Sequence, residues 1–183
     1  MKSIVIRFVL VVMALTVFAH AGEVESGLQI GDYAQAFYVT DVTGPSAGEE
    51  LCYRCRYSAR PVISIFARGI DDDVRKLVKG IDGLVGQHKD EQLAAFVVLL
   101  TDRPLDQEAK LKAAAKDSGI VNTPLTTYKD MEGPHKYRIH KDADVTVMMW
   151  VEGEVKVNHV FTKGKLSANA IRQVVADTSK ILE

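Results

Sequence analysis

The chemistry of this sequence centres on its only two cysteines, Cys52 and Cys55, which form a Cys-x-x-Cys motif. Two thiols at this spacing can close a local disulfide, exchange it with another protein, or supply two ligands of a metal ion. Tyr53 and Arg54 lie between them, and Arg56 follows directly. Positive charge beside a cysteine favours the thiolate, which is the form that attacks a disulfide. The motif therefore predicts thiol–disulfide exchange through Cys52 and Cys55, with Tyr53, Arg54 and Arg56 as supporting residues.

Two other interpretations of the motif remain open. A structural bridge would restrict the loop before the next strand, with only a small stabilising effect because the closed loop is short. A metal site would need ligands from elsewhere, and the candidates are His88, His135, His140 and His159. None of these histidines has a characteristic spacing to the cysteines, so we expect no metal and no other cofactor. Arg56 occupies the position of the histidine in a c-type haem motif, which excludes that site in its simple form.

The first residues have the three parts of a secretory signal peptide. Lys2 and Arg7 make the start positive, Phe8–Phe18 is an uncharged apolar run, and Ala19-His20-Ala21 is a small-x-small cleavage site. The apolar run is shorter than the roughly 20 residues that a membrane-spanning helix needs, which disfavours an uncleaved anchor. We therefore expect cleavage after Ala21 and no stable membrane insertion afterwards.

Residues 22–183 are then expected to form a single domain in the periplasm or the secreted fraction. The chain has 23 basic and 24 acidic residues and a formal net charge of −1, without the basic excess that nucleic-acid binding usually requires. Disulfides persist in exported compartments, which suits the two cysteines. The expected partners are accordingly protein thiols or disulfides, and the oligomeric state is not predicted.

The hydrophobic pattern alternates between short β-rich runs and amphipathic stretches. Strands are expected at 36–41, 61–66, 93–100, 145–151 and 155–161, with a further short strand near 125–128. Helices are expected after caps at 71–73 and at Ser167, and over 105–116, and a hairpin turn at Glu152-Gly153. This order predicts a three-layer α/β domain whose central mixed sheet of about five strands is flanked by helices.

The element order and the Cys-x-x-Cys motif together resemble the thioredoxin-like superfamily, and in particular its redoxin or peroxiredoxin-like branch. That branch opens with a Gly-x5-Phe-x3-Asp-x2-Gly segment, which is matched here by Gly31, Phe37, Asp41 and Gly44. Its first core strand is matched by Arg-Pro-Val-Ile-Ser-Ile-Phe at 60–66. The resemblance covers residues 28–182 and implies a thioredoxin-like fold.

Two features of the family's active site are missing from the places where the resemblance would put them. The family's reactive cysteine follows the first core strand, where this chain has Gly69, Ile70 and Asp71. The family's cis-proline precedes the first hairpin strand, near Asp144, where no proline stands. Family habit names the first cysteine of the motif, Cys52, as the attacker. The displaced site leaves two functions open, a thiol–disulfide oxidoreductase and a non-enzymatic interaction module with a structural Cys52–Cys55 bridge.

Overall fold

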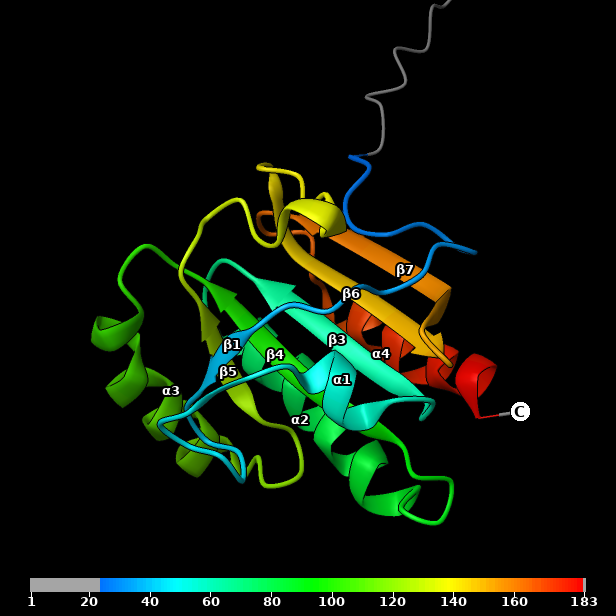
Figure 1. Cartoon of the computed structure of the whole chain (residues 1–183), viewed down its shortest axis with the longest axis horizontal. Coiled ribbons are helices and arrows are strands. Elements are labelled where there is room, and N and C mark those ends of the chain that lie inside the picture. The colour runs from blue at the N-terminus through cyan, green and yellow to red at the C-terminus, as the bar shows by residue number, and fades with distance from the viewer. Residues whose placement is uncertain (1–23, 183) are drawn as a thin grey trace, which may run out of the picture.

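The structure is a computed structural model that describes residues 24–182. A mixed β-sheet lies between two outer layers (Figure 1). This arrangement confirms the predicted three-layer α/β fold. The predicted signal peptide, residues 1–21, lies outside the described residues. Across residues 24–182, no helix has the length and apolar character needed to cross a membrane.

The sheet has seven strands, where the sequence predicted about five. In chain order they are β1 (Val39–Asp41), β2 (Glu50–Leu51), β3 (Val62–Ala67), β4 (Ala94–Leu100), β5 (Leu125–Tyr128), β6 (Ala143–Val151) and β7 (Glu154–Thr162). Their order across the sheet is β2-β1-β5-β4-β3-β6-β7. The three middle strands β5, β4 and β3 run parallel to one another, and the outer strands pair antiparallel. The parallel strands therefore share one amino end and one carboxyl end.

Within the described part of the chain, four α-helices accompany the sheet. They are α1 (Tyr53–Tyr57), α2 (Asp72–Gln87), α3 (Pro104–Ser118) and α4 (Ala168–Asp177), with 3-10 turns η1 (His135–Tyr137) and η2 (Thr178–Ile181). As predicted, Asp71 caps α2 and Ser167 caps α4, each accepting hydrogen bonds from backbone N–H groups of the first turn. The predicted turn between β6 and β7 is also present, with Glu152 and Gly153 at φ values of 54° and 87°. Two positive φ values in succession are typical of a tight hairpin turn.

Two apolar cores lie on opposite faces of the sheet. One core packs α2, α3 and α4 against the sheet, through residues such as Leu77, Leu111 and Val174. The other core packs α1 and the segment before β1 against the opposite face, which is the near face in Figure 1. Its aromatic members include Phe37, Tyr53, Phe66, Phe96, Tyr137 and Trp150. The Cys-x-x-Cys segment is therefore attached to an aromatic core.

Candidate thiol–disulfide site

Cys52 and Cys55 are joined by a disulfide bond. Cys52 is the N-cap residue of α1, and its Sγ accepts a hydrogen bond from the backbone N–H of Cys55 at 3.0 Å. The helix is only five residues long and stands between β2 and β3. The sequence did not predict it, because one turn of helix is too short to produce a hydrophobic period. The pairing of the two cysteines agrees with the motif, whereas its role in exchange remains a proposal.

The two cysteines differ in exposure. Cys52 is 7% exposed, whereas Cys55 is exposed to solvent. Cys52 was expected to be the attacker by family habit, and an attacking cysteine is normally the accessible one. The observed order of exposure is the reverse of that expectation.

Tyr53 is part of the core and not of the surface. It is 1% exposed, and its ring stacks on Phe96 with centroids 5.4 Å apart. Its hydroxyl donates a hydrogen bond to the carboxylate of Asp41 at 2.9 Å. Burial, together with this hydrogen bond and the negative charge of Asp41, raises the pKa of Tyr53 far above its usual value, so the phenol stays neutral. Tyr53, predicted as a supporting residue beside the cysteines, therefore anchors α1 on the core and offers no surface to a partner.

A buried carboxylate, Asp41, connects Tyr53 to the loop before β2. Asp41 is 1% exposed and accepts hydrogen bonds from the backbone N–H groups of Gly44 at 2.7 Å and Ser46 at 2.9 Å. A Cβ atom at position 44 would collide with the Asp41 carboxylate and the Tyr53 hydroxyl, so only glycine fits there. Asp41 and Gly44, which carried the family resemblance, therefore hold α1 in place.

The arginines beside the cysteines bond to oxygen atoms. Arg54 donates to the backbone carbonyls of Ala34 and Ser58, both at 3.1 Å, and its guanidinium lies against Gly153 of the β6–β7 turn. Arg56 donates to the hydroxyl of Ser46 at 2.9 Å and lies 5.7 Å above the ring of Tyr53. Within residues 24–182, no hydrogen bond joins either guanidinium to a cysteine sulfur. Their observed contacts fasten α1 to its surroundings.

The Cys-x-x-Cys segment lies at the amino end of the parallel strands. The hydroxyl of Tyr57 bonds to the carbonyl of Ala95, near the start of β4, and Asp41 pairs with Thr126, near the start of β5. Burial raises the pKa of Tyr57 to about 12. The six residues of β3 separate this end from the place of the family's usual cysteine by roughly 20 Å. The order of the sequence already indicated that the Cys-x-x-Cys motif precedes β3, whereas the family's cysteine follows it. In the folded sheet, this difference places the motif at the opposite end of the parallel strands.

The carboxyl end of β3, where the family's site would stand, is occupied by Arg68. Its guanidinium donates to the carbonyls of Met131 at 2.6 Å, Ala143 at 2.9 Å and His140 at 3.1 Å. Asp71, which follows, is engaged in capping α2. No cysteine follows β3, and no proline stands near Asp144 at the start of β6. This end therefore has neither of the two features that the family uses for exchange.

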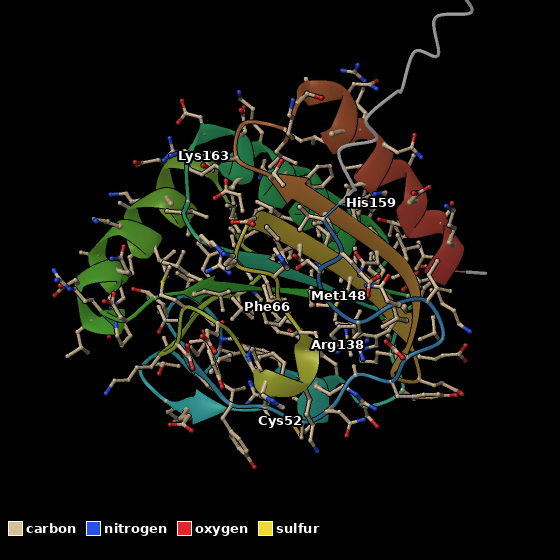
Figure 2. The ribbon with its side chains drawn as sticks, turned by 90° about the horizontal axis from the view of Figure 1, so that it is seen from above. Cys52, Phe66, Arg138, Met148, His159 and Lys163 are labelled. Carbon is tan, nitrogen blue, oxygen red and sulfur yellow. A yellow bond between two sulfur atoms is a disulfide. The ribbon has the colours of Figure 1, made fainter. Side chains whose placement is uncertain are left out.

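The histidines considered as metal ligands do not gather around the cysteines. His159 on β7 bonds to Asp177 of α4 at 3.0 Å, and Figure 2 labels His159 and Cys52 on opposite sides of the sheet. His88 pairs with Glu91, near the end of α2. Among residues 24–182, no group of three or more histidine, cysteine or acidic side chains could hold a metal ion. The local environment of the cysteines thus consists of aromatic rings, arginines and backbone.

No protein-family model matches the sequence, and no curated protein is significantly similar to it. Solved structures do match. The thioredoxin domain of a thiol-disulfide oxidoreductase from Bacteroides vulgatus is 20% identical, with a TM-score of 0.57, and the match covers 81% of this chain and 99% of that one. This chain has a thioredoxin-like fold.

Other structures with this fold are similar over comparable lengths. An uncharacterized conserved protein from Geobacillus kaustophilus has a TM-score of 0.64 at 15% identity, and the match covers 87% of this chain and 85% of that one. A thiol peroxidase from Chromobacterium violaceum has a TM-score of 0.56 at 13% identity, covering 84% of this chain and 89% of that one. The structural similarity establishes the thioredoxin-like fold. At sequence identities this low it does not establish the activity, which must be argued from the site.

Proposed function

We propose that this thioredoxin-like protein is exported and exchanges disulfides with protein thiols through Cys52 and Cys55. One observation supports the exchange above all others: the disulfide joins a buried cysteine to an exposed one on a single turn of helix. A partner's sulfur has access to such a bond at one end, while the other end stays anchored. Reactivity in exchange depends on that access and on the stability of the departing thiolate.

The supporting residues act by holding the helix that carries the motif. The hydroxyl of Tyr53 donates a hydrogen bond to Asp41, and Arg54 of the same helical turn donates hydrogen bonds to the carbonyls of Ala34 and Ser58. Arg56 stays near the exposed side of the turn, where its positive charge favours thiolate formed during exchange. On this proposal the two cysteines alternate between disulfide and dithiol while α1 and its contacts stay in place.

A non-enzymatic interaction module is the second candidate. The observation that favours it is the carboxyl end of β3, where Arg68 and Asp71 are committed to structural contacts. A thioredoxin-like domain without its usual site can persist as a binding scaffold, and the Cys52–Cys55 bond would then only restrict a short loop. The two candidates differ in one measurable property, the reduction potential of the bond.

The decisive measurement is that potential, determined by equilibrating the purified chain in glutathione buffers and trapping free thiols with an alkylating reagent. A value between about −120 and −270 mV lies in the range of exchange catalysts and supports the proposal. A value below about −300 mV marks a structural bridge and replaces the proposal with the interaction module. A parallel assay measures reduction of a disulfide-bonded reporter protein, in which Cys52→Ser should have no activity above background.

Export has its own test. The full chain is expressed with its first 21 residues, and the molecular mass of the product is measured in the exported and retained fractions. A product that begins at Gly22 in the exported fraction supports export through a cleaved signal peptide. An intact product that stays with the membrane fraction would point to an anchor.

A further inference from the structure

We propose that Cys55 is the sulfur that exchanges with the partner, and that Cys52 is the resolving sulfur. The inference rests on the proposed function, because it assigns the two roles within that exchange. It reverses the order given by family habit, in which the first cysteine of the motif attacks. The reversal follows from where α1 places each sulfur, and two independent features of the site support it.

Access is the first feature. A thiolate attacks a disulfide along the line through both sulfurs, from the side opposite the departing sulfur. Attack on Cys55 therefore requires free space beyond Cys55, which is exposed. Attack on Cys52 requires space beyond Cys52, which is only 7% exposed. Burial of Cys52 blocks that approach, whereas the approach to Cys55 comes from solvent.

The stability of the departing thiolate is the second feature. The Sγ atom of Cys52 accepts the backbone N–H of Cys55 at 3.0 Å. A hydrogen bond to the charged form lowers the pKa of a thiol, and a thiol of lower pKa departs faster. Among the described residues, Cys55 Sγ receives no hydrogen bond in return. In the oxidised chain both features direct attack to Cys55 and departure to Cys52, whereas in the reverse direction the choice of Cys55 as nucleophile rests on its exposure alone.

The resulting sequence of steps balances with a protein dithiol as the co-reactant. One thiolate of the dithiol bonds to Cys55 Sγ, the Cys52–Cys55 bond breaks, and its electron pair stays on Cys52 Sγ. The second thiolate of the dithiol then bonds to the first partner sulfur, and Cys55 departs as a thiolate. The partner has lost two electrons and two protons, and this chain has gained the electrons as a dithiol. In the reverse direction Cys55 is the nucleophile and Cys52 resolves the mixed disulfide.

Mapping the mixed disulfide in the unmodified chain tests the assignment directly. The oxidised chain is mixed with reduced glutathione, stopped with an alkylating reagent after a short time, and analysed by peptide mass spectrometry. We expect glutathione on Cys55 and the alkyl group on Cys52. The opposite labelling overturns the inference and leaves the proposed function standing, because exchange would still have occurred.

Single-cysteine variants give a rate for each sulfur. Cys52→Ser keeps a good helix N-cap, so α1 should persist in that variant. Its remaining thiol, Cys55, should react with oxidised glutathione about tenfold faster or more than the remaining thiol of Cys55→Ser, because exposure of Cys55 outweighs the thiolate stabilisation at buried Cys52. In concentrated guanidinium chloride the two rates should become equal, because the difference comes from the fold.

The other outcomes are equally decisive. A Cys55→Ser variant that reacts as fast as Cys52→Ser, or faster, overturns the assignment. If neither folded variant reacts faster than it does in guanidinium chloride, and no mixed disulfide forms in the unmodified chain, the proposed exchange itself fails. The labelling pattern thus separates failure of the role assignment from failure of the function.

Discussion

The two ends of the parallel strands differ in what they carry: the Cys52–Cys55 disulfide lies at the amino end, and structural contacts fill the carboxyl end, where the resemblance places the family's reactive cysteine. At the carboxyl end of β3, Arg68 donates three hydrogen bonds to backbone carbonyls, and Asp71 caps α2. At the amino end, the disulfide stands on a one-turn helix with one exposed cysteine. The first end is held by hydrogen bonds to backbone carbonyls, and the second carries a disulfide whose Cys55 is exposed to solvent.

On the proposed function, this contrast means that the fold alone does not determine where chemistry takes place. Function depends on particular side chains, and the same framework supports a site wherever it can hold them. Here the short helix α1 holds the two cysteines. It is attached to the aromatic core through Tyr53, whose hydroxyl is hydrogen-bonded to Asp41. The measurements below test whether the two ends differ in role as their contacts indicate.

Removing the aromatic anchor of the amino end should have the largest effect. Tyr53→Ala deletes a ring that is 1% exposed and stacked on Phe96, and should lower the free energy of unfolding by about 3–5 kcal/mol. Tyr53→Phe keeps the ring and loses only the bond to Asp41, at a cost of about 1–2 kcal/mol. Urea unfolding measures both. Similar values for the two variants would show that the ring does not anchor α1.

Reducing the disulfide should have an intermediate effect. The loop it closes is short, so the chain-entropy model predicts that reduction lowers the free energy of unfolding by about 2 kcal/mol. Urea unfolding with and without a reducing agent measures the difference, and Cys52→Ser under the same conditions should be insensitive to the reductant. A loss of more than about 4 kcal/mol would favour a structural bridge over an exchange site.

The two arginine clamps form a matched pair of variants. Arg54→Met and Arg68→Met each retain an apolar stem and lose hydrogen bonds to carbonyls, so each should cost about 1–3 kcal/mol of stability. Only Arg54→Met should also shift the reduction potential of the disulfide, because only Arg54 belongs to α1. A shift in Arg68→Met with none in Arg54→Met would contradict the division between the two ends.

The smallest expected effect is a loss of stability at high pH that originates in α1. Burial holds the pKa of Tyr57 at about 12, above the usual value of 10.0. A raised folded-state pKa contributes stability below pH 10.0 that is lost as the pH rises toward about 12. Tyr57→Phe should reduce this loss, measured as urea midpoints across that range. An identical pH profile in the variant would locate the loss elsewhere.

Much of the fold was predictable because the hydrophobic pattern is strong in the long elements. The run at 61–66 and the stripe behind Asp71 correspond to β3 and α2. The hydrophobic pattern did not predict β2 and α1, which have two and five residues. Elements this short do not contain enough residues to show a strand or helix periodicity in hydrophobicity. The spacing of Asp41 and Gly44 did indicate the turn that supports α1. An aspartate shortly before a glycine is typical of turns in which the aspartate side chain accepts a backbone hydrogen bond.

The site was only partly predictable, for a related reason. The Cys-x-x-Cys motif identified the two sulfurs, because cysteines so close in the chain can pair without help from the fold. It did not reveal that Tyr53 would be buried and Cys55 exposed. Exposure depends on which face of α1 meets the aromatic core, and that core comes from residues far apart in the sequence.

By itself, the sequence determined the layered α/β architecture and the absence of a cysteine after β3, and it singled out Cys52 and Cys55 as the candidate pair. These properties depend on local patterns and on residue identity. Only the tertiary structure decided that the motif lies at the amino end of the parallel strands, that Arg68 closes the other end, and that Cys52 is the buried partner. Each of these depends on contacts between residues distant in the chain, such as Arg54 with Ala34 and Arg68 with Ala143. Such contacts exist only once the sheet has brought those residues together.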